Sequence, residues 1–167
     1  MVWVRSEHAG ALAVLSVWLS AFVPWNVTFS SVSGGSVLFV RFAFVQVRYT
    51  YGLSIARGVV VSDPLSAISF QAGQSIVVAY QAWAAGAGVF AVAVAFSVVY
   101  YLAEERVEAL SFDPVRLIGV LLGLTGAVFA ASTYLLVTRG FPGVPIPVGV
   151  VFLFVFAGVL LTLERTD

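Results

Sequence analysis

Two arginines inside one apolar stretch are the side chains of this sequence best placed to do chemistry. Arg41 and Arg48 lie in "SVLFVRFAFVQVRYTYG", residues 36–52. Arginines that line the pore of an oligomeric channel would set its anion preference. As a membrane helix, the stretch would place Arg41 near the bilayer centre, at a cost of about 2.5–3.5 kcal/mol.

The residue pattern of this stretch favours strands over a fifth membrane helix. Apolar residues alternate along it, and beyond Ala43 the alternation changes phase, which indicates a bulge or bend. The first apolar face is formed by Leu38, Val40, Phe42 and Phe44, and the second by Val45, Val47, Tyr49 and Tyr51. Residues 27–32 and the Ser-Gly-Gly turn after them predict a hairpin, and residues 54–62 can add another strand.

Other reactive side chains are few. The chain has no Cys, which excludes disulfides, thiolate metal sites and Cys nucleophiles. His8, the only histidine, follows Glu7 at an expected membrane boundary, where a proton or metal site is less favoured than a spectator role. The acidic cluster over residues 104–108 is interpreted as a solvated helix end rather than a partner site. We therefore expect no enzyme activity, no cofactor and no metal.

Asn26-Val27-Thr28 is an N-x-T sequon, so Asn26 is a candidate N-glycosylation site. The sequon lies directly after an expected membrane helix. It is accessible only if the segment after that helix is extracellular and stands clear of the bilayer.

The composition predicts an integral membrane protein. The 167 residues are 61% hydrophobic and 10% charged, with a mean hydropathy of +1.06, whereas soluble domains carry about 25% charged residues. The formal net charge is zero, so nucleic acid is not an expected partner. Membrane lipid is.

Four apolar runs divide the chain into one membrane domain over residues 1–167. The expected transmembrane helices are 8–25, 74–102, 114–137 and 146–163, separated by a β-rich extracellular loop 26–73, a cytoplasmic loop 103–113 and a short outer turn 138–145. The first run could also be a cleaved signal peptide, but it exceeds a typical h-region. Arginines near the short loops place both termini in the cytoplasm, at the plasma membrane. The predicted fold is a four-transmembrane-helix bundle with a small extracellular antiparallel sheet.

Small residues recur at helical spacing in two of these runs. Such stripes let helices approach closely, within a bundle or between copies. The stripe in the second run is Ala84, Gly88, Ala91 and Ala95, and the stripe in the third is Gly119, Gly123, Ala127 and Ala131. Packing inside the bundle is the preferred interpretation, and dimerisation is the alternative.

The layout resembles the claudin/PMP22-like superfamily of four-helix membrane proteins. Pro24-Trp25 at the end of the first run is similar to that family's Pro-x-Trp, and "FQAGQSIVV" over residues 70–78 resembles its Leu-Gln-Ala-x-Arg run. The family's loop disulfide and Gly-Leu-Trp motif are missing here. The chain also resembles uncharacterised haloarchaeal multi-pass membrane proteins. The resemblance implies cell-surface adhesion or membrane organisation.

Three functions follow as hypotheses. The leading one is a non-enzymatic membrane protein whose sheet contacts other membrane proteins or a second copy of the chain. The candidate contact residues are Arg41, Phe42, Phe44, Arg48, Tyr49 and Tyr51. The alternatives are an accessory subunit of a larger membrane complex and an oligomeric channel.

Overall fold

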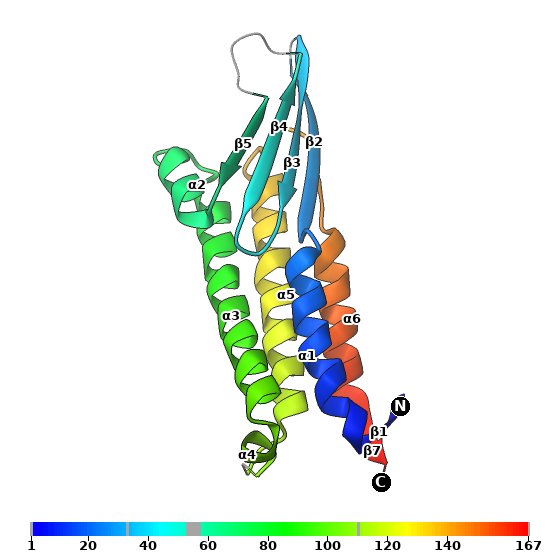
Figure 1. The fold of residues 1–167 in the computed structure, drawn as a ribbon. Coiled ribbons are helices and arrows are strands. Elements are labelled where there is room, and N and C mark those ends of the chain that lie inside the picture. The colour runs from blue at the N-terminus through cyan, green and yellow to red at the C-terminus, as the bar shows by residue number, and fades with distance from the viewer. Residues whose placement is uncertain (1, 33, 53–57, 110, 167) are drawn as a thin grey trace.

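A set of helices running side by side carries a sheet at one end (Figure 1). The computed structural model describes residues 2–32, 34–52, 58–109 and 111–166. The helices of these residues are α1 (Ser6–Phe22), α2 (Pro64–Phe70), α3 (Val77–Leu102), α4 (Glu104–Glu108), α5 (Pro114–Thr138) and α6 (Val148–Thr162). The strands are β1 (Val2–Arg5), β2 (Asn26–Val32), β3 (Gly35–Arg41), β4 (Gln46–Tyr51), β5 (Val59–Ser62), β6 (Val144–Ile146) and β7 (Leu163–Thr166). β1 and β7 pair in parallel near the two termini, at the end opposite the large sheet.

The prediction of a four-transmembrane-helix bundle is wrong. Of the six helices that the described residues form, two are long and apolar enough to cross a membrane, α3 and α5. α1 has 17 residues and α6 has 15, whereas the hydrocarbon core requires about 20. The predicted fourth span, 146–163, is shortened because residues 144–146 join the sheet and α6 begins only after Pro147.

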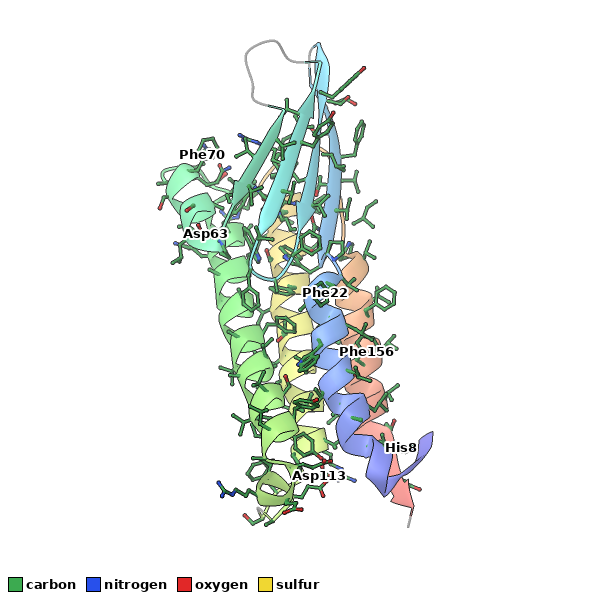
Figure 2. The ribbon with its side chains drawn as sticks, viewed as in Figure 1. His8, Phe22, Asp63, Phe70, Asp113 and Phe156 are labelled. Atoms are coloured by element: carbon green, nitrogen blue, oxygen red, sulfur yellow. The ribbon has the colours of Figure 1, made fainter. Side chains whose placement is uncertain are left out.

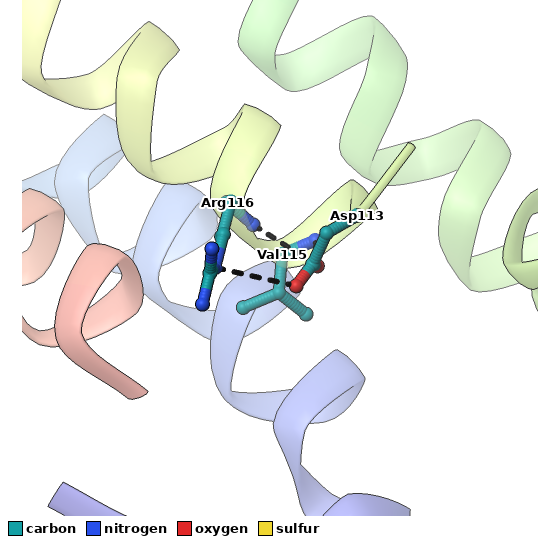
Figure 3. A network of polar contacts seen from close by, with 3 residues as sticks. All are labelled: Asp113, Val115 and Arg116. Carbon is teal, nitrogen blue, oxygen red and sulfur yellow. Dashed lines mark hydrogen bonds and ion pairs between the residues drawn. The ribbon is translucent and has the colours of Figure 1, made fainter. Parts of the chain in front are cut away.

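Two helices begin at Asp-Pro pairs. Asp63 caps α2 and Asp113 caps α5, each with proline in the first turn. Oδ1 of Asp113 accepts hydrogen bonds from the backbone N–H groups of Val115 at 2.9 Å and Arg116 at 3.3 Å. Nε of Arg116 lies 3.6 Å from the other carboxylate oxygen (Figure 3). α5 therefore starts at Pro114, where the sequence placed it.

α5 is the central helix, because it packs against both α3 and α6. On α3, a Cβ added at Gly86 would lie 2.5 Å from the ring of Phe129. On α5, a Cβ at Gly119 would lie 3.1 Å from Cβ of Leu160. Glycine at these points lets the helix axes approach to a distance that larger side chains would prevent.

The large sheet is antiparallel, with strand order β5-β4-β3-β2-β6. The predicted hairpin is confirmed, because β2 pairs with β3 across a turn in which Gly34 has a φ of +88°. The expected bulge after Ala43 is instead a full reversal, in which Phe42 N–H donates to the carbonyl of Val45 at 2.8 Å. Residues 36–52 thus form parts of two strands, neither a fifth span nor one bent strand. Of the strand expected at 54–62, residues 54–57 lie outside the described residues.

The sheet is not built from the long loop alone. β6, from the turn between α5 and α6, pairs with β2 and ties the last helix to the first hairpin. In the sequence this segment was expected to be only a short outer turn.

Candidate functional site

The guanidinium of Arg41 is the centre of a buried polar cluster on the sheet face that turns toward the helices, here called the inner face. Arg41 is 1% exposed. Its Nη1 donates to Oδ1 of Asn26 at 2.8 Å and to Oγ1 of Thr28 at 3.1 Å. Its Nε donates to Oε1 of Gln46 at 2.9 Å, and its Nη2 donates to the hydroxyl of Tyr80 at 3.3 Å. Side chains of β2, β4 and α3 accept the hydrogen bonds of the guanidinium, and none of these partners is a carboxylate.

Aromatic rings complete the surroundings of Arg41. Its Cζ lies 4.5 Å from the ring centroid of Phe141 and 5.1 Å from that of Phe39, distances at which a cation is attracted to an aromatic face. Burial lowers the pKa of Arg41, and the Tyr80 hydroxyl partly offsets this effect. Because an arginine guanidinium is not deprotonated in proteins, the side chain keeps its charge. Arg41 is a structural cation that fixes the sheet on the helices.

The turn between β3 and β4 enters the helical layer, and two tryptophans hold it. Nε1 of Trp83 donates to the carbonyls of Phe42 at 3.1 Å and Ala43 at 2.9 Å. Nε1 of Trp25 donates to the same Phe42 carbonyl at 3.1 Å. Trp25 is buried and stacks on Phe129 with ring centroids 4.9 Å apart. Trp25 is therefore a core residue where the sheet meets the helices.

Beside the Arg41 cluster, the inner face leaves a cavity of about 260 Å³ between the sheet, α2 and the start of α3. Its polar lining consists of Gln46, Arg48, Ser62, Ser66, Gln71 and Tyr80. Cζ of Arg48 lies 5.8 Å from the ring centroid of Phe70. Figure 2 shows Phe70 and Asp63 on α2, at the side of the sheet. Gln46 and Tyr80 belong to both the cavity and the Arg41 cluster.

The opposite face of the sheet, here called the outer face, is apolar. The strand registers place the following residues on it: Val27, Phe29, Ser31, Ser36, Leu38, Val40, Val47, Tyr49, Tyr51, Val59, Val61, Val144 and Ile146. None of them is charged, and Phe29 is 57% and Tyr51 69% exposed. The usual arrangement of a half-buried sheet, apolar inside and polar outside, is thus reversed.

The predicted contact residues do not share one surface. Arg41 is buried, so it cannot be a contact residue, and this expectation is wrong. Phe42 is half-buried in the turn, and Phe44 is 43% exposed with its ring centroid 5.7 Å from that of Phe90. Arg48 is half-buried on the inner face. Of the six candidates, Tyr49 and Tyr51 lie exposed on the outer face.

Comparison with known proteins identifies a family. A family model described as "Family of unknown function (DUF7549)" matches residues 2–165. The chain belongs to the DUF7549 family. No curated protein matches it.

In this DUF7549 chain, Asn26 is fully buried, which contradicts its candidacy for glycosylation in the folded protein. Its Oδ1 accepts hydrogen bonds from Arg41 and from Oγ1 of Thr28 at 2.9 Å. Both polar residues of the sequon therefore belong to the Arg41 cluster. Their alternation on β2, opposite Arg41 on β3, was a signal that the sequence contained.

The small-residue stripes of the DUF7549 chain take different places. On α5, Gly119 is buried against α6 and Gly123 faces Ala157, whereas Ala127 and Ala131 are exposed. On α3, Ala84 is half-buried, and Gly88, Ala91 and Ala95 are exposed. Packing of the α3 stripe inside the chain is therefore wrong. The face of α3 that packs is the adjacent one, which carries Trp83, Gly86, Phe90 and Ala93.

The described residues of the DUF7549 chain hold no group of three or more His, Cys, Asp or Glu side chains that could bind a metal ion. The polar chemistry that they do concentrate lies on the inner face, around Arg41 and Arg48. This arrangement can hold a sheet in place and bind an anion.

Proposed function

We propose that this DUF7549 chain is a non-enzymatic membrane protein that joins a second copy of itself through the outer face of its sheet. The observation that carries the proposal is the reversed polarity of the sheet. Its charged and amide side chains turn toward the helices, and its exposed face carries mainly apolar residues. Exposed apolar patches of this kind on a folded protein mark interaction sites.

The helices support a membrane location. α3 contains no charged residue, and Arg116 is the single one in α5. At 1.5 Å per residue, the 26 residues of α3 extend about 39 Å, enough for the roughly 30 Å hydrocarbon core. α1 and α6 pack beside them. In the proposed arrangement the sheet lies outside the plasma membrane and both termini, which lie at the opposite end (Figure 1), are cytoplasmic.

The outer face suits a second copy better than a charged partner. It has no charge to direct a complementary surface, and an apolar face can meet its own copy around a two-fold axis. From strand spacing and rise, the face measures roughly 500 Å². Two copies would bury about 1,000 Å² in total, the lower bound of a specific interface. A contact of this size is weak on its own and is strengthened when both copies are confined to one membrane.

Cysteine crosslinking in liposomes tests the proposal, because the native chain has no Cys and gives no background. Phe29→Cys places a thiol at the outer face, and Leu65→Cys places one on α2, where Leu65 is 71% exposed. With a short bifunctional thiol reagent, we expect a covalent dimer from Phe29→Cys and monomer from Leu65→Cys. Adding Tyr49→Glu to Phe29→Cys should reduce the dimer at least tenfold, because it buries an unpaired carboxylate.

Monomer from Phe29→Cys at every protein-to-lipid ratio would overturn the proposal. Stoichiometric co-purification of a different protein, lost in Tyr49→Glu, would instead favour an accessory subunit. The channel hypothesis loses one of its two anion-selecting residues, because Arg41 is enclosed by its own partners. The resemblance to the claudin/PMP22 superfamily stays a prediction, and the proposal does not depend on it.

A further inference from the structure

Arg48 is the cation of the inner face whose hydrogen-bonding capacity is not used within the described residues. Its Nε is buried and has no hydrogen-bond partner there. Buried N–H groups are almost always paired, and an unpaired one is costly. Arg41, seven residues earlier, has all three of its nitrogens engaged. Both arginines lie on the inner face, but Nε has a hydrogen-bond partner among the described residues only in Arg41.

None of the described residues that line the cavity beside Arg48 is acidic. The nearest carboxylate along the chain, Asp63, is occupied as the cap of α2. It accepts hydrogen bonds from the backbone N–H groups of Leu65 at 2.9 Å and Ser66 at 3.0 Å, and from Oγ of Ser66 at 2.5 Å. The positive charge of Arg48 in the cavity is therefore not compensated by the lining.

The rest of the cavity is suited to an apolar group. Phe39, Val60, Ala67 and Phe70 form this part of its wall. An apolar cavity of about 150 Å³ holds a benzene ring, so the 260 Å³ here would hold a molecule of roughly ten non-hydrogen atoms. Hydroxyl and amide groups of Ser62 and Gln71 line the same space and can donate hydrogen bonds.

We propose that this cavity binds an oxyanion that carries an apolar group, with the carboxylate or phosphate oxygens on the guanidinium of Arg48. A guanidinium binds such groups through two parallel N–H···O bonds, which would satisfy Nε. The site is separate from the outer face and does not depend on dimerisation.

Two sources can supply this chemistry, a free organic anion or the headgroup of an anionic lipid. α2 lies beside the start of α3 (Figure 2), and its Leu65 and Phe70 are 71% and 69% exposed. In the proposed membrane arrangement, on which this point rests, α2 and the cavity would lie close to the level of the lipid headgroups. The two sources are distinguished by experiment.

The experiment measures binding of benzoate by isothermal titration calorimetry, with the full chain in a neutral detergent. Benzamide, of the same size but uncharged, is the matched ligand. We expect benzoate to bind at least tenfold more tightly than benzamide, and Arg48→Gln to lose at least tenfold in benzoate affinity. Arg116→Gln removes an exposed arginine at the opposite end and should leave binding unchanged.

A second arm tests the lipid source by native mass spectrometry after reconstitution with phosphatidylglycerol and phosphatidylcholine. Retention of one phosphatidylglycerol by the native chain, lost in Arg48→Gln, assigns the site to a lipid headgroup. Binding of benzoate without such retention assigns it to a free anion. Ala67→Leu fills the cavity without removing charge and should abolish both forms of binding.

The proposal is overturned if neither benzoate nor phosphatidylglycerol binds. It is also overturned if both bind equally to the native chain, Arg48→Gln and Ala67→Leu. Far-UV circular dichroism and the thermal midpoint of each variant show whether it is folded. A folded variant that retains full binding counts against the site.

Discussion

The two faces of the large sheet differ in both polarity and exposure. The inner face carries Asn26, Thr28, Arg41, Gln46 and Arg48, and the helices cover it. The outer face has no charged residue and lies exposed. Both are produced by the same strands, since side chains alternate along each strand. The difference shows that alternation separates two sets of residues but does not decide which set is buried.

In this sheet, hydrogen bonds decide which set of side chains is buried. A buried guanidinium is tolerated because four side-chain acceptors surround it, and without them its burial would cost several kcal/mol. Turning the sheet over would bury the apolar face but would break this cluster. The apolar face is therefore left for another molecule to cover, and the predictions below test the two faces against each other.

The largest effect is expected from Arg41→Met. It leaves Oε1 of Gln46 buried without its donor and takes one of two donors from Oδ1 of Asn26, and it removes the cation from the ring of Phe141. We expect a loss of about 3 kcal/mol in the free energy of unfolding. Chemical unfolding in detergent, followed by tryptophan fluorescence, measures it. The matched variant Arg116→Met, at an exposed position, should change stability by less than about 0.5 kcal/mol.

If Arg41→Met were as stable as the native chain, the polar cluster would not be what orients the sheet. A double variant separates the cation from its partners. Replacing Gln46 by Leu together with Arg41→Met removes the acceptor that lost its donor, and it should recover part of the loss.

A smaller effect is expected where the β3–β4 turn brings the inner face onto the helices. Trp83→Phe removes the N–H that serves the carbonyls of Phe42 and Ala43. We expect a loss of about 1–2 kcal/mol. Trp25→Phe should cost less through hydrogen bonding, because the Phe42 carbonyl keeps the N–H of Trp83. Unfolding of both variants under the same conditions gives the comparison, and equal losses would contradict this division of roles.

The sequence predicted the parts of the fold that are encoded by residues close together in the chain. The Ser-Gly-Gly turn and the alternation around it were enough to predict the hairpin, and the third apolar run was predicted to begin at residue 114, where α5 starts. The number of membrane-length helices was not predictable in this way. Residues 146–163 are apolar throughout, and hydropathy cannot show that Ile146 pairs with Val27 in a sheet.

The candidate site was predicted only in part. The sequence singled out Arg41 and Arg48 but placed both on a contact surface. Their separation depends on residues distant in the chain, since Tyr80 reaches Arg41 from α3 and Phe70 lies near Arg48 from α2. The register of β2 against β3 would have paired Asn26 with Arg41 and indicated one polar face.

The smallest effect is expected at Asp63, whose cap holds α2 against the side of the inner-face cavity. Hydrogen bonds from Ser66 and from the backbone lower the pKa of this exposed carboxyl. Because the pKa is lowered, the carboxylate stabilises α2 in full when the pH is above 3.8, the ordinary pKa of the group. This contribution is lost as the pH falls through the lowered pKa. The amide protection factors of Leu65 and Ser66, measured by hydrogen exchange, should fall over that range. Asp63→Asn caps without titrating and should show no such fall.

An equal fall in both proteins would mean that another group opens α2. A fall confined to the native chain would show that the side of the inner face can be loosened while the Arg41 cluster stays intact.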